Sequence, residues 1–426
     1  MKLHFQNQNQ QQGGVLIVTI FIASIVGIAL GSYLLLVRSQ DVAVVRSQAW
    51  NSALAMAEAG AEEAMAQLNP GAASTTLTVD RTANGWHAPS GGVYGPMSRN
   101  LTNGSYSVIF TDVQFPIIYS TGYTTLPDLS ATVSRVVRVA TTNIPLFSVS
   151  LAARTNITMT GNGVSTDSFD SSNSGLSTNG HYDSSKTSTN GDVASLYGTV
   201  NLGGHGIEGN LYLGPTATLN GNGSSVSGKV YTDFNTDFPQ VVPPNTTGWI
   251  NLLLPPLLPT VVNGVAYTYA FFNSGDYVIP NMSGGSVYVG TNATVRLSIQ
   301  AGSSGDVRIG GTGSNAGKLT MYVAAASFSI SGNSVVDGGS PANLSYYGLA
   351  SNTSLTFSGN AAFTGTIYAP SASLTLNGSG SSTYDVMGSV IASSVTIHGN
   401  FMFHYDQNLD NAGPSRGYLA TDWSEL

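Results

Sequence analysis

The chain has 426 residues, of which 42% are hydrophobic and only 8% are Asp, Glu, Lys or Arg, and its formal net charge is −8. Soluble proteins carry about 25% charged residues, so a helix-rich cytosolic enzyme with charged helix faces is excluded. The acidic balance leaves no basic face, and we expect no nucleic-acid partner. Since the chain contains no Cys, disulfides and thiolate metal sites are excluded too.

Residues 15–37 form an apolar run without a single charged side chain. As a helix this run is about 35 Å long, enough to cross the roughly 30 Å hydrocarbon core of a bilayer. A secretory signal peptide has a shorter apolar core that ends at a small-residue cleavage site, and no such site ends this run. We therefore expect a retained membrane-spanning helix in contact with the lipid bilayer.

The helical pattern continues beyond the apolar run. From Val42 to Leu68, apolar and small residues recur every three or four positions, which predicts an amphipathic helix that stops before Pro70. We expect one helix over 15–69, lipid-facing in its first half. Within it, Ala23, Gly27 and Gly31 form a series of small residues that lets apolar helices pack closely. The alternative is that Gly is simply common in membrane helices.

Residues 70–148 contain strand-like runs at 106–111, 115–119 and 132–141, separated by Pro and Gly. We expect them to form a small antiparallel sheet of three or four strands. This sheet would pack on the second half of the helix as a headgroup, and we assign no chemistry to it.

The N-terminal part resembles the type IV pilin-like proteins, specifically the PilX-like minor pilins. The resemblance rests on a polar leader that ends in Gly13-Gly14, on the apolar helix that starts at Val15, and on the Ala-Glu-Ala-Gly segment at 57–60. It implies that a prepilin peptidase cuts between Gly14 and Val15, so that residues 1–14 are a leader peptide. It also implies that the helix packs with other pilin-like subunits or stays in the inner membrane. Mature position five would be Thr19 in place of the Glu of major pilins.

The C-terminal two thirds contains a repeat. Six strings share an apolar/Thr alternation that ends in Gly and a small polar residue, and they lie at 157–163, 217–223, 328–334, 355–361, 374–380 and 395–401. The alternation predicts short strands with one inward face, and the Gly-polar pair predicts tight turns. A unit of about twenty residues is typical of a solenoid. We expect a mainly β chain whose residues 149–426 form a right-handed parallel β-helix, with a β-sandwich as the alternative.

Two stretches interrupt the repeat: a polar loop at 161–195 and a Pro-rich excursion at 238–260. The DSFDSS string at 167–172, the string at 365–378 and the His404–Asp406 triplet resemble an uncharacterised β-helical domain. That domain is attached to pilin-like N-termini in bacterial envelope proteins, and the resemblance implies no activity.

Three groups of residues are candidates for chemistry. Asp167 and Asp170 begin an oxygen-rich segment similar to the start of a calcium loop, although a solvated loop explains it equally well. Glycoside hydrolysis needs two facing carboxyl groups, and the polygalacturonase-like strings at 204–206 and 235–237 lack the adjacent acidic pair, so we expect no catalytic residue. Tyr346, Tyr347 and Tyr368 either stack on carbohydrate or pack inward, and His398, His404 and Asp406 are expected to cap the last coil.

Together these features predict a protein associated with type IV pili that is not an enzyme and needs no cofactor or metal. It would sit in the inner membrane through one helix and present its β-helix in the periplasm or at the cell surface, for pilus assembly, display or adhesion. Its expected partners are the bilayer, other pilin-like subunits and surface carbohydrate. The alternatives are a membrane-tethered carbohydrate-active enzyme and a self-assembling envelope scaffold.

Overall fold

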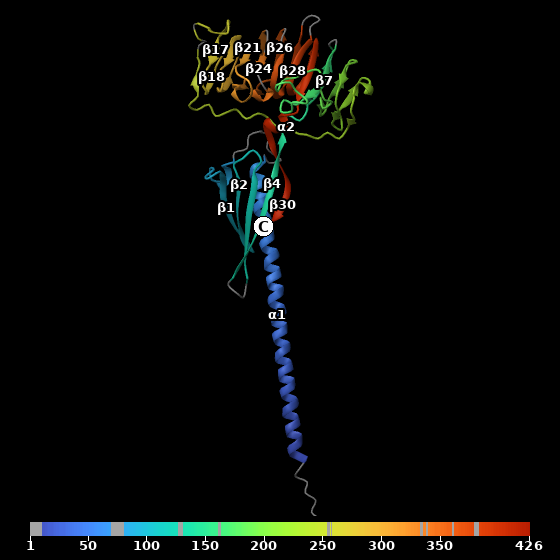
Figure 1. Ribbon diagram of the computed structural model, residues 1–426, viewed down its shortest axis with the longest axis vertical. Coiled ribbons are helices and arrows are strands. Elements are labelled where there is room, and N and C mark those ends of the chain that lie inside the picture. Colours follow the sequence, from blue (N-terminus) through green and yellow to red (C-terminus); the bar gives the residue numbers. More distant parts are fainter. Residues whose placement is uncertain are drawn as a thin grey trace, which may run out of the picture. The chain divides into compact units, whose positions relative to one another are not determined.

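The computed structural model describes residues 11–69, 81–126, 131–160, 163–253, 256, 258–332, 335–337, 340–359, 362–378 and 383–426 (Figure 1). The chain divides into two compact units. Unit 1 holds the chain up to Gln67 together with residues 81–142 and 420–426, and unit 2 holds most of the rest, including residues 143–419. Each unit is built on its own β-sheet.

Unit 1 begins with helix α1 (Gln11–Leu68). This is the one helix among the described residues that is long and apolar enough to cross a membrane, with a mean hydropathy of 2.6 in its most apolar window. The large apolar side chains between Val15 and Leu36 are 54–71% exposed. No described residue of unit 1 covers them, so this half of the helix presents an apolar surface on every side. The predicted N-terminal apolar helix is confirmed.

The second half of α1 is buried along one face. The buried side chains recur every three or four residues and are mostly Ala: Ala49, Ala53, Ala57, Ala61, Ala64 and Leu68. These short side chains let the helix backbone lie directly on the sheet. A Cβ added to Gly122 would lie 2.0 Å from the Ala53 carbonyl oxygen, and one added to Gly60 would lie 2.3 Å from Ser120 Oγ. This close approach explains why Gly60 ends the Ala-Glu-Ala-Gly segment.

The sheet of unit 1 has five strands in the order β1-β2-β3-β4-β30. The strands are β1 (Val93–Leu101), β2 (Gly104–Thr111), β3 (Ile117–Thr125), β4 (Thr132–Pro145) and β30 (Ser415–Glu425). The first four pair antiparallel, which confirms the predicted small antiparallel sheet. A short 3₁₀ turn, η1 (Ala83–Gly85), precedes β1.

The fifth strand was not predicted. Thr421 Oγ1 donates to the Ala140 carbonyl oxygen at 3.2 Å and Leu426 N donates to the Val136 carbonyl oxygen at 3.0 Å, so the C-terminal end lies beside β4. We had expected residues 149–426 to form the repeat domain alone. Instead, unit 2 is an insertion between two neighbouring strands of unit 1. The sequence of β30 (SRGYLATDWSE) has no regular alternation of apolar and polar residues, so it did not predict this pairing.

Unit 2 contains a 23-stranded sheet, whose strands come from two segments that we call the first arm (residues 151–231) and the second arm (residues 250–406). The first arm contributes β5 (Leu151–Ala153), β6 (Ile157–Met159), β7 (Ser165–Phe169), β8 (Val193–Ser195), β9 (Thr199–Asn201), β10 (Gly206–Ile207), β11 (Leu211–Leu213), β12 (Thr218–Asn220) and β13 (Val230–Tyr231). Its 3₁₀ turn is η2 (Gly223–Ser225).

The second arm contributes β14 (Ile250–Asn251), β17 (Tyr269–Phe271), β18 (Gly275–Ile279), β19 (Gly285–Val289), β20 (Thr294–Ile299), β21 (Ser304–Ile309), β22 (Lys318–Val323), β23 (Ser327–Gly332), β24 (Val335–Asp337), β25 (Leu344–Gly348), β26 (Ser354–Gly359), β27 (Phe363–Asn377), β28 (Thr383–His398) and β29 (Asn400–Asp406). It also holds a small antiparallel hairpin of β15 (Thr260–Val262) and β16 (Val265–Tyr267), and the turns η3 (Gly313–Asn315) and η4 (Pro341–Asn343). Helix α2 (Leu409–Ala412) follows.

The strands of unit 2 pair in parallel with strands about one repeat away along the chain. Leu355 pairs with Leu374, and Leu374 pairs with Val395. All three side chains are at most 1% exposed and belong to one apolar core that runs through the unit. The expected large parallel sheet and the inward-facing side of these strands are confirmed.

The two arms are stacked in an order that differs from the chain order. β28 pairs with β27 on one side and with β5 and β6 on the other, for example through Val390 and Leu151. The first arm therefore continues the stack beyond the last strands of the second arm. Figure 1 shows this as yellow strands at β17 and β18, red strands at β28 and green strands from β7 onward. The chain enters and leaves unit 2 near the middle of the stack.

A return strap, residues 232–249, connects the end of the first arm to the start of the second. Its Phe238 side chain is 4% exposed and lies in a second apolar cluster with Phe147 and Tyr368. Tyr368 Oη donates to the Pro239 carbonyl oxygen at 2.7 Å, and the Arg154 guanidinium donates to the Phe238 carbonyl oxygen. The first part of the expected Pro-rich excursion (238–260) thus belongs to a strap that contacts both arms, while residues 254, 255 and 257 lie outside the described residues.

Candidate functional site

The expected processing site lies inside helix α1. The Gly14–Val15 bond is part of the described helix, Val15 is 65% exposed, and a Cβ on Gly14 would meet nothing within 4 Å. The hydroxyls that follow are satisfied within the helix, since Thr19 Oγ1 donates to the Leu16 carbonyl oxygen at 2.8 Å. Ser24 and Ser32 bond back to carbonyls in the same way. Such internal bonds suit a helix surrounded by lipid.

The three small residues expected to mediate helix packing lie on one face of the exposed half of α1. Ala23, Gly27 and Gly31 follow one another at four-residue spacing, and a Cβ on Gly27 or Gly31 would meet nothing within 4 Å. Within the described part of the chain, this face has no partner for the two Gly residues. It remains a candidate for contact with another helix.

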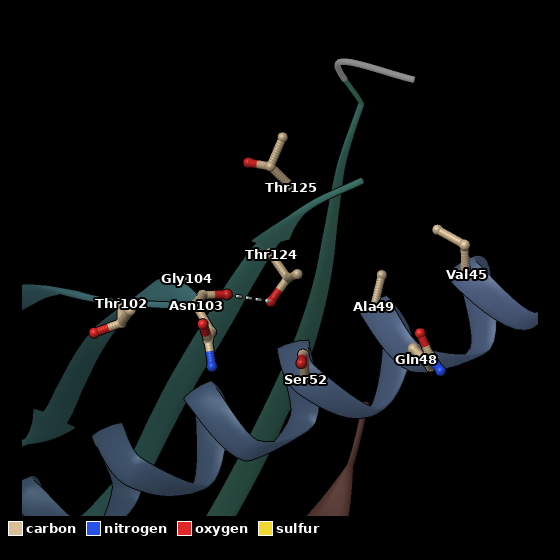
Figure 2. Close-up of a pocket in the computed structure, with 9 residues that line it drawn as sticks. All are labelled: Val45, Gln48, Ala49, Ser52, Thr102, Asn103, Gly104, Thr124 and Thr125. Atoms are coloured by element: carbon tan, nitrogen blue, oxygen red, sulfur yellow. Dashed lines mark hydrogen bonds between the residues drawn. The ribbon is translucent and has the colours of Figure 1, made fainter. Parts of the chain in front are cut away.

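Unit 1 also holds an uncharged groove of about 460 Å³ (Figure 2). Its lining comes from one face of α1 and from the ends of the neighbouring strands: Val45, Gln48, Ala49, Ser52, Thr102, Asn103, Gly104, Thr124 and Thr125. Thr124 Oγ1 donates to the Asn103 carbonyl oxygen at 3.3 Å. None of the lining side chains titrates near neutral pH, so the groove offers hydrogen-bonding groups and no acid–base chemistry.

The strongest cluster of titratable groups lies where the two arms meet. His404 on β29 has Nδ1 2.5 Å from Asp167 Oδ1 and Nε2 3.4 Å from Asp385 Oδ1. The ring of Tyr182 stacks on the imidazole with centroids 3.6 Å apart, and Tyr182 Oη donates to Asp167 Oδ2 at 2.9 Å. His404 is only 2% exposed. The cluster therefore places an imidazole between two carboxylates and beneath an aromatic ring.

The electrostatics of this cluster favour the charged imidazolium. Burial acts to lower the pKa of His404, but the hydrogen bonds to Asp167 and Asp385 outweigh burial and raise the pKa above its ordinary value. Burial, and then the bond to Asp167, raise the pKa of Tyr182, so its hydroxyl stays protonated. No Ser or Thr hydroxyl is hydrogen-bonded to His404 within the described residues. His404, Asp167 and Asp385 thus form an ion-pair cluster across the junction of the arms, which we call the clasp.

Sequence reasoning found only part of this cluster. Asp167 and His404 were singled out separately, Asp167 for calcium and His404 as an end cap, whereas Asp385 and Tyr182 were missed. His404 is not at an end, because β29 pairs with β7 in the interior of the stack. His398 bonds Thr160 at 3.0 Å and is separate from His404. The order of the arms brings Asp167 and Tyr182 to His404, and residue patterns alone do not give that order.

The segment expected to start a calcium loop forms hydrogen-bonded turns. Asp170 Oδ1 accepts from Ser172 N at 2.9 Å and from Ser172 Oγ at 2.6 Å, while both oxygens of Asp167 bond His404 and Tyr182. Over the described residues, no three His, Asp or Glu side chains are arranged to hold a metal ion. Asp167 and Asp170 thus have separate structural partners.

The structure also places the residues considered for sugar stacking and for catalysis. Tyr346 and Tyr368 are 1% and 0% exposed, so they pack inward and cannot stack on carbohydrate. Tyr346 Oη donates to Asn352 Oδ1 at 3.0 Å. The string at 204–206 precedes and enters β10, and the string at 235–237 belongs to the return strap.

Comparisons with known proteins add little. Residues 260–412 match a family model described as "Domain of unknown function (DUF7305)", less than half of the chain. No curated protein matches. Among solved structures the chain is similar to the competence-associated pilin ComZ from Thermus thermophilus, with 10% identity and a TM-score of 0.23, over 89% of this chain and 98% of that one. A TM-score this low does not establish a shared fold.

Proposed function

We propose that this is a pilin-like membrane protein of the PilX-like type that displays an inserted β-helical domain for pilus assembly, surface display or adhesion. The observation that carries the proposal is the division of α1. Its first half exposes apolar side chains on all sides, while its second half is buried on an antiparallel sheet through Ala and Gly contacts. A surface of this size needs lipid or another apolar helix. In this proposal the inner membrane holds residues 15–37, and unit 2 lies in the periplasm or at the cell surface.

The proposed right-handed parallel β-helix for unit 2 is supported by the pairing pattern. Parallel strands require a crossover connection, and here paired residues recur at intervals of 19 to 27 residues. One line of pairs runs from β18 through β20 and β22 to β25, and a second runs from β23 through β26 to β27. Successive turns of one coil would produce both lines.

We also propose that unit 2 is not an enzyme. The support is the closed state of the His-carboxylate cluster that its described residues contain, in which His404 is 2% exposed and both ring nitrogens face carboxylates. A general base must be able to reach its substrate. Asp385, whose side chain is 46% exposed, is the cluster's most accessible member.

N-terminal sequencing of the protein extracted from membranes of its native host tests the pilin-like assignment. Processing predicts a new N-terminus at Val15 in the wild type. A Gly14→Val variant should keep Met1, and a Gly13→Val variant should be processed, because the proposed cut directly follows Gly14. Intact Met1 on wild-type protein would contradict processing. Release of the protein by alkaline carbonate would contradict the membrane anchor independently.

A further inference from the structure

The outer face of the stack in unit 2 carries a line of in-register residues. Tyr212 on β11 lies between Leu211 and Leu213, which are buried in the core. Because side chains alternate along a strand, Tyr212 points away from that core. The residues paired with it along the stack are Ala194 on β8 and Tyr231 on β13.

The middle and the end of this line are in different environments. In the middle, Ala152 and Ala194 are fully buried in the second apolar cluster, together with Phe238 of the return strap. At the end, Tyr231 is 38% exposed. β13 is the last strand of the first arm, and its described partner is β11. The strap therefore covers the line in its middle and leaves the final tyrosine open.

The two end tyrosines form an ordered flat surface, which we call the end platform (Tyr212 and Tyr231). Their ring centroids are 5.1 Å apart and their planes differ by 9°. Phe234 of the strap supports Tyr212 with a centroid distance of 5.9 Å. Tyr212 covers one face of the Tyr231 ring, and the Tyr231 side chain is still 38% exposed. A ring held in this way loses little conformational entropy when a ligand stacks on it.

Three polar residues directly precede β8, β11 and β13, beside the platform: Asp192, Asn210 and Lys229. Asp192 Oδ1 accepts from Asn210 N at 2.6 Å, and Asn210 Oδ1 accepts from Lys229 N at 3.0 Å. Asp192 lies two positions before Ala194, the residue that pairs with Tyr212, and its charge adds to burial in raising the pKa of Tyr212. The platform thus combines an aromatic face with a carboxylate and an amide at its side.

We propose that the end platform binds a neutral polysaccharide, with one pyranose ring stacked on Tyr231 and its hydroxyls bonded to the neighbouring polar groups. The C–H bonds on one face of a pyranose carry partial positive charge, which matches the negative face of an aromatic ring. Hydroxyls both donate and accept, so they suit the Asp192 carboxylate and the Asn210 amide alike. A nucleic acid would also stack, but its phosphates would meet Asp192 and the exposed Asp233 in a chain with a net charge of −8.

This inference rests on the proposed display function and specifies the class of ligand that the displayed domain binds. The test is affinity electrophoresis of the detergent-extracted full chain in native gels that contain hydroxyethylcellulose, glycol chitin or dextran. We expect at least one polysaccharide to retard the wild type, and Tyr231→Ala to weaken that retardation by about tenfold. Tyr231→Phe keeps the ring and should stay within about twofold of the wild type.

Tyr123→Ala is the matched control, because Tyr123 is 37% exposed on β3 of unit 1 and lies outside the platform. Equal retardation of the wild type and Tyr231→Ala, or no retardation by any of the three polysaccharides, would overturn the proposal. A smaller particle for Tyr231→Ala in gel filtration would assign the ring to a contact with a second copy and overturn it as well. Sequencing the N-terminus of the same preparations keeps a failure here separate from a failure of the pilin-like assignment.

Discussion

His404 on β29 lies directly opposite Asp167 on β7, and the 2.5 Å between Nδ1 and Oδ1 crosses the junction of the two arms of unit 2. Asp385 on β28 faces the other ring nitrogen at 3.4 Å. Because the imidazole is 2% exposed, carboxylates replace water as its partners. A residue near the end of the chain is thereby fastened to one from the first arm, more than two hundred positions earlier.

Replacing His404 by Gln should loosen this junction. The variant leaves two carboxylates without their cation, so we expect a loss of about 2 kcal/mol in the free energy of opening at pH 6. Hydrogen exchange of the β7 and β29 amides measures this local opening. Unchanged exchange at these strands would contradict the role of the clasp. His398→Gln is the matched control, since His398 bonds only Thr160 by the described contacts.

The same pair predicts a dependence on pH. The pKa of His404 is raised above its ordinary value of 6.5 because the bonds to Asp167 and Asp385 outweigh burial. A raised pKa contributes stability that is complete below 6.5 and is lost as the pH rises through the folded-state value. Asp406 acts in the same direction at lower pH, since burial raises its pKa. Protection of β7 and β29 should therefore fall on going from pH 6 to pH 9, and His404→Gln should flatten that fall.

The sequence predicted those elements whose signal is local. The apolar length of α1 and the alternation around Leu355, Leu374 and Val395 specify a helix and inward-facing strands regardless of what lies next to them. Which residue lies beside Asp167 depends on how the two arms are stacked, because β7 of the first arm pairs with β29 of the second arm. Parallel strands of similar composition pair almost equally well in either order, so residue patterns do not fix that order. The pairing of β30 with β4 is also a long-range contact, between residues 281 positions apart at Thr421 and Ala140, and no local pattern predicts it.

The contact between α1 and the sheet of unit 1 predicts a strong effect of one added methyl group. A Cβ at Gly122 would lie 2.0 Å from the Ala53 carbonyl oxygen and 2.4 Å from Ala57 N. Both are backbone atoms and cannot rotate away, so Gly122→Ala should destabilise unit 1 by about 3 kcal/mol. Resistance of the 81–142 region to protease reports the change. Gly31→Ala meets nothing within 4 Å, and a similar loss in that control would show that the contact is not the cause.

The return strap should depend on Phe238. Its side chain is 4% exposed in the second apolar cluster, so Phe238→Ala should cost about 3 kcal/mol or more. The consequence is local release of the strap, seen as new protease cleavage within 232–249. Phe272→Ala is the matched control, because Phe272 is 55% exposed. If both variants are cut alike, Phe238 does not hold the strap.

The small residues on the exposed half of α1 predict lateral association in the membrane. Gly27 lies between Ala23 and Gly31 on one face, and a side chain there would keep two helices apart. The chain has no Cys, so Ala23→Cys provides a single reporter whose disulfide dimers can be counted after oxidation. Adding Gly27→Leu should lower the dimer yield about fivefold, the effect of roughly 1 kcal/mol of packing. Ala29→Leu adds similar bulk about 200° around the helix and should leave the yield unchanged. Equal yields for the two variants would mean that this face makes no helix contact. Residues 15–37 would then contact lipid alone.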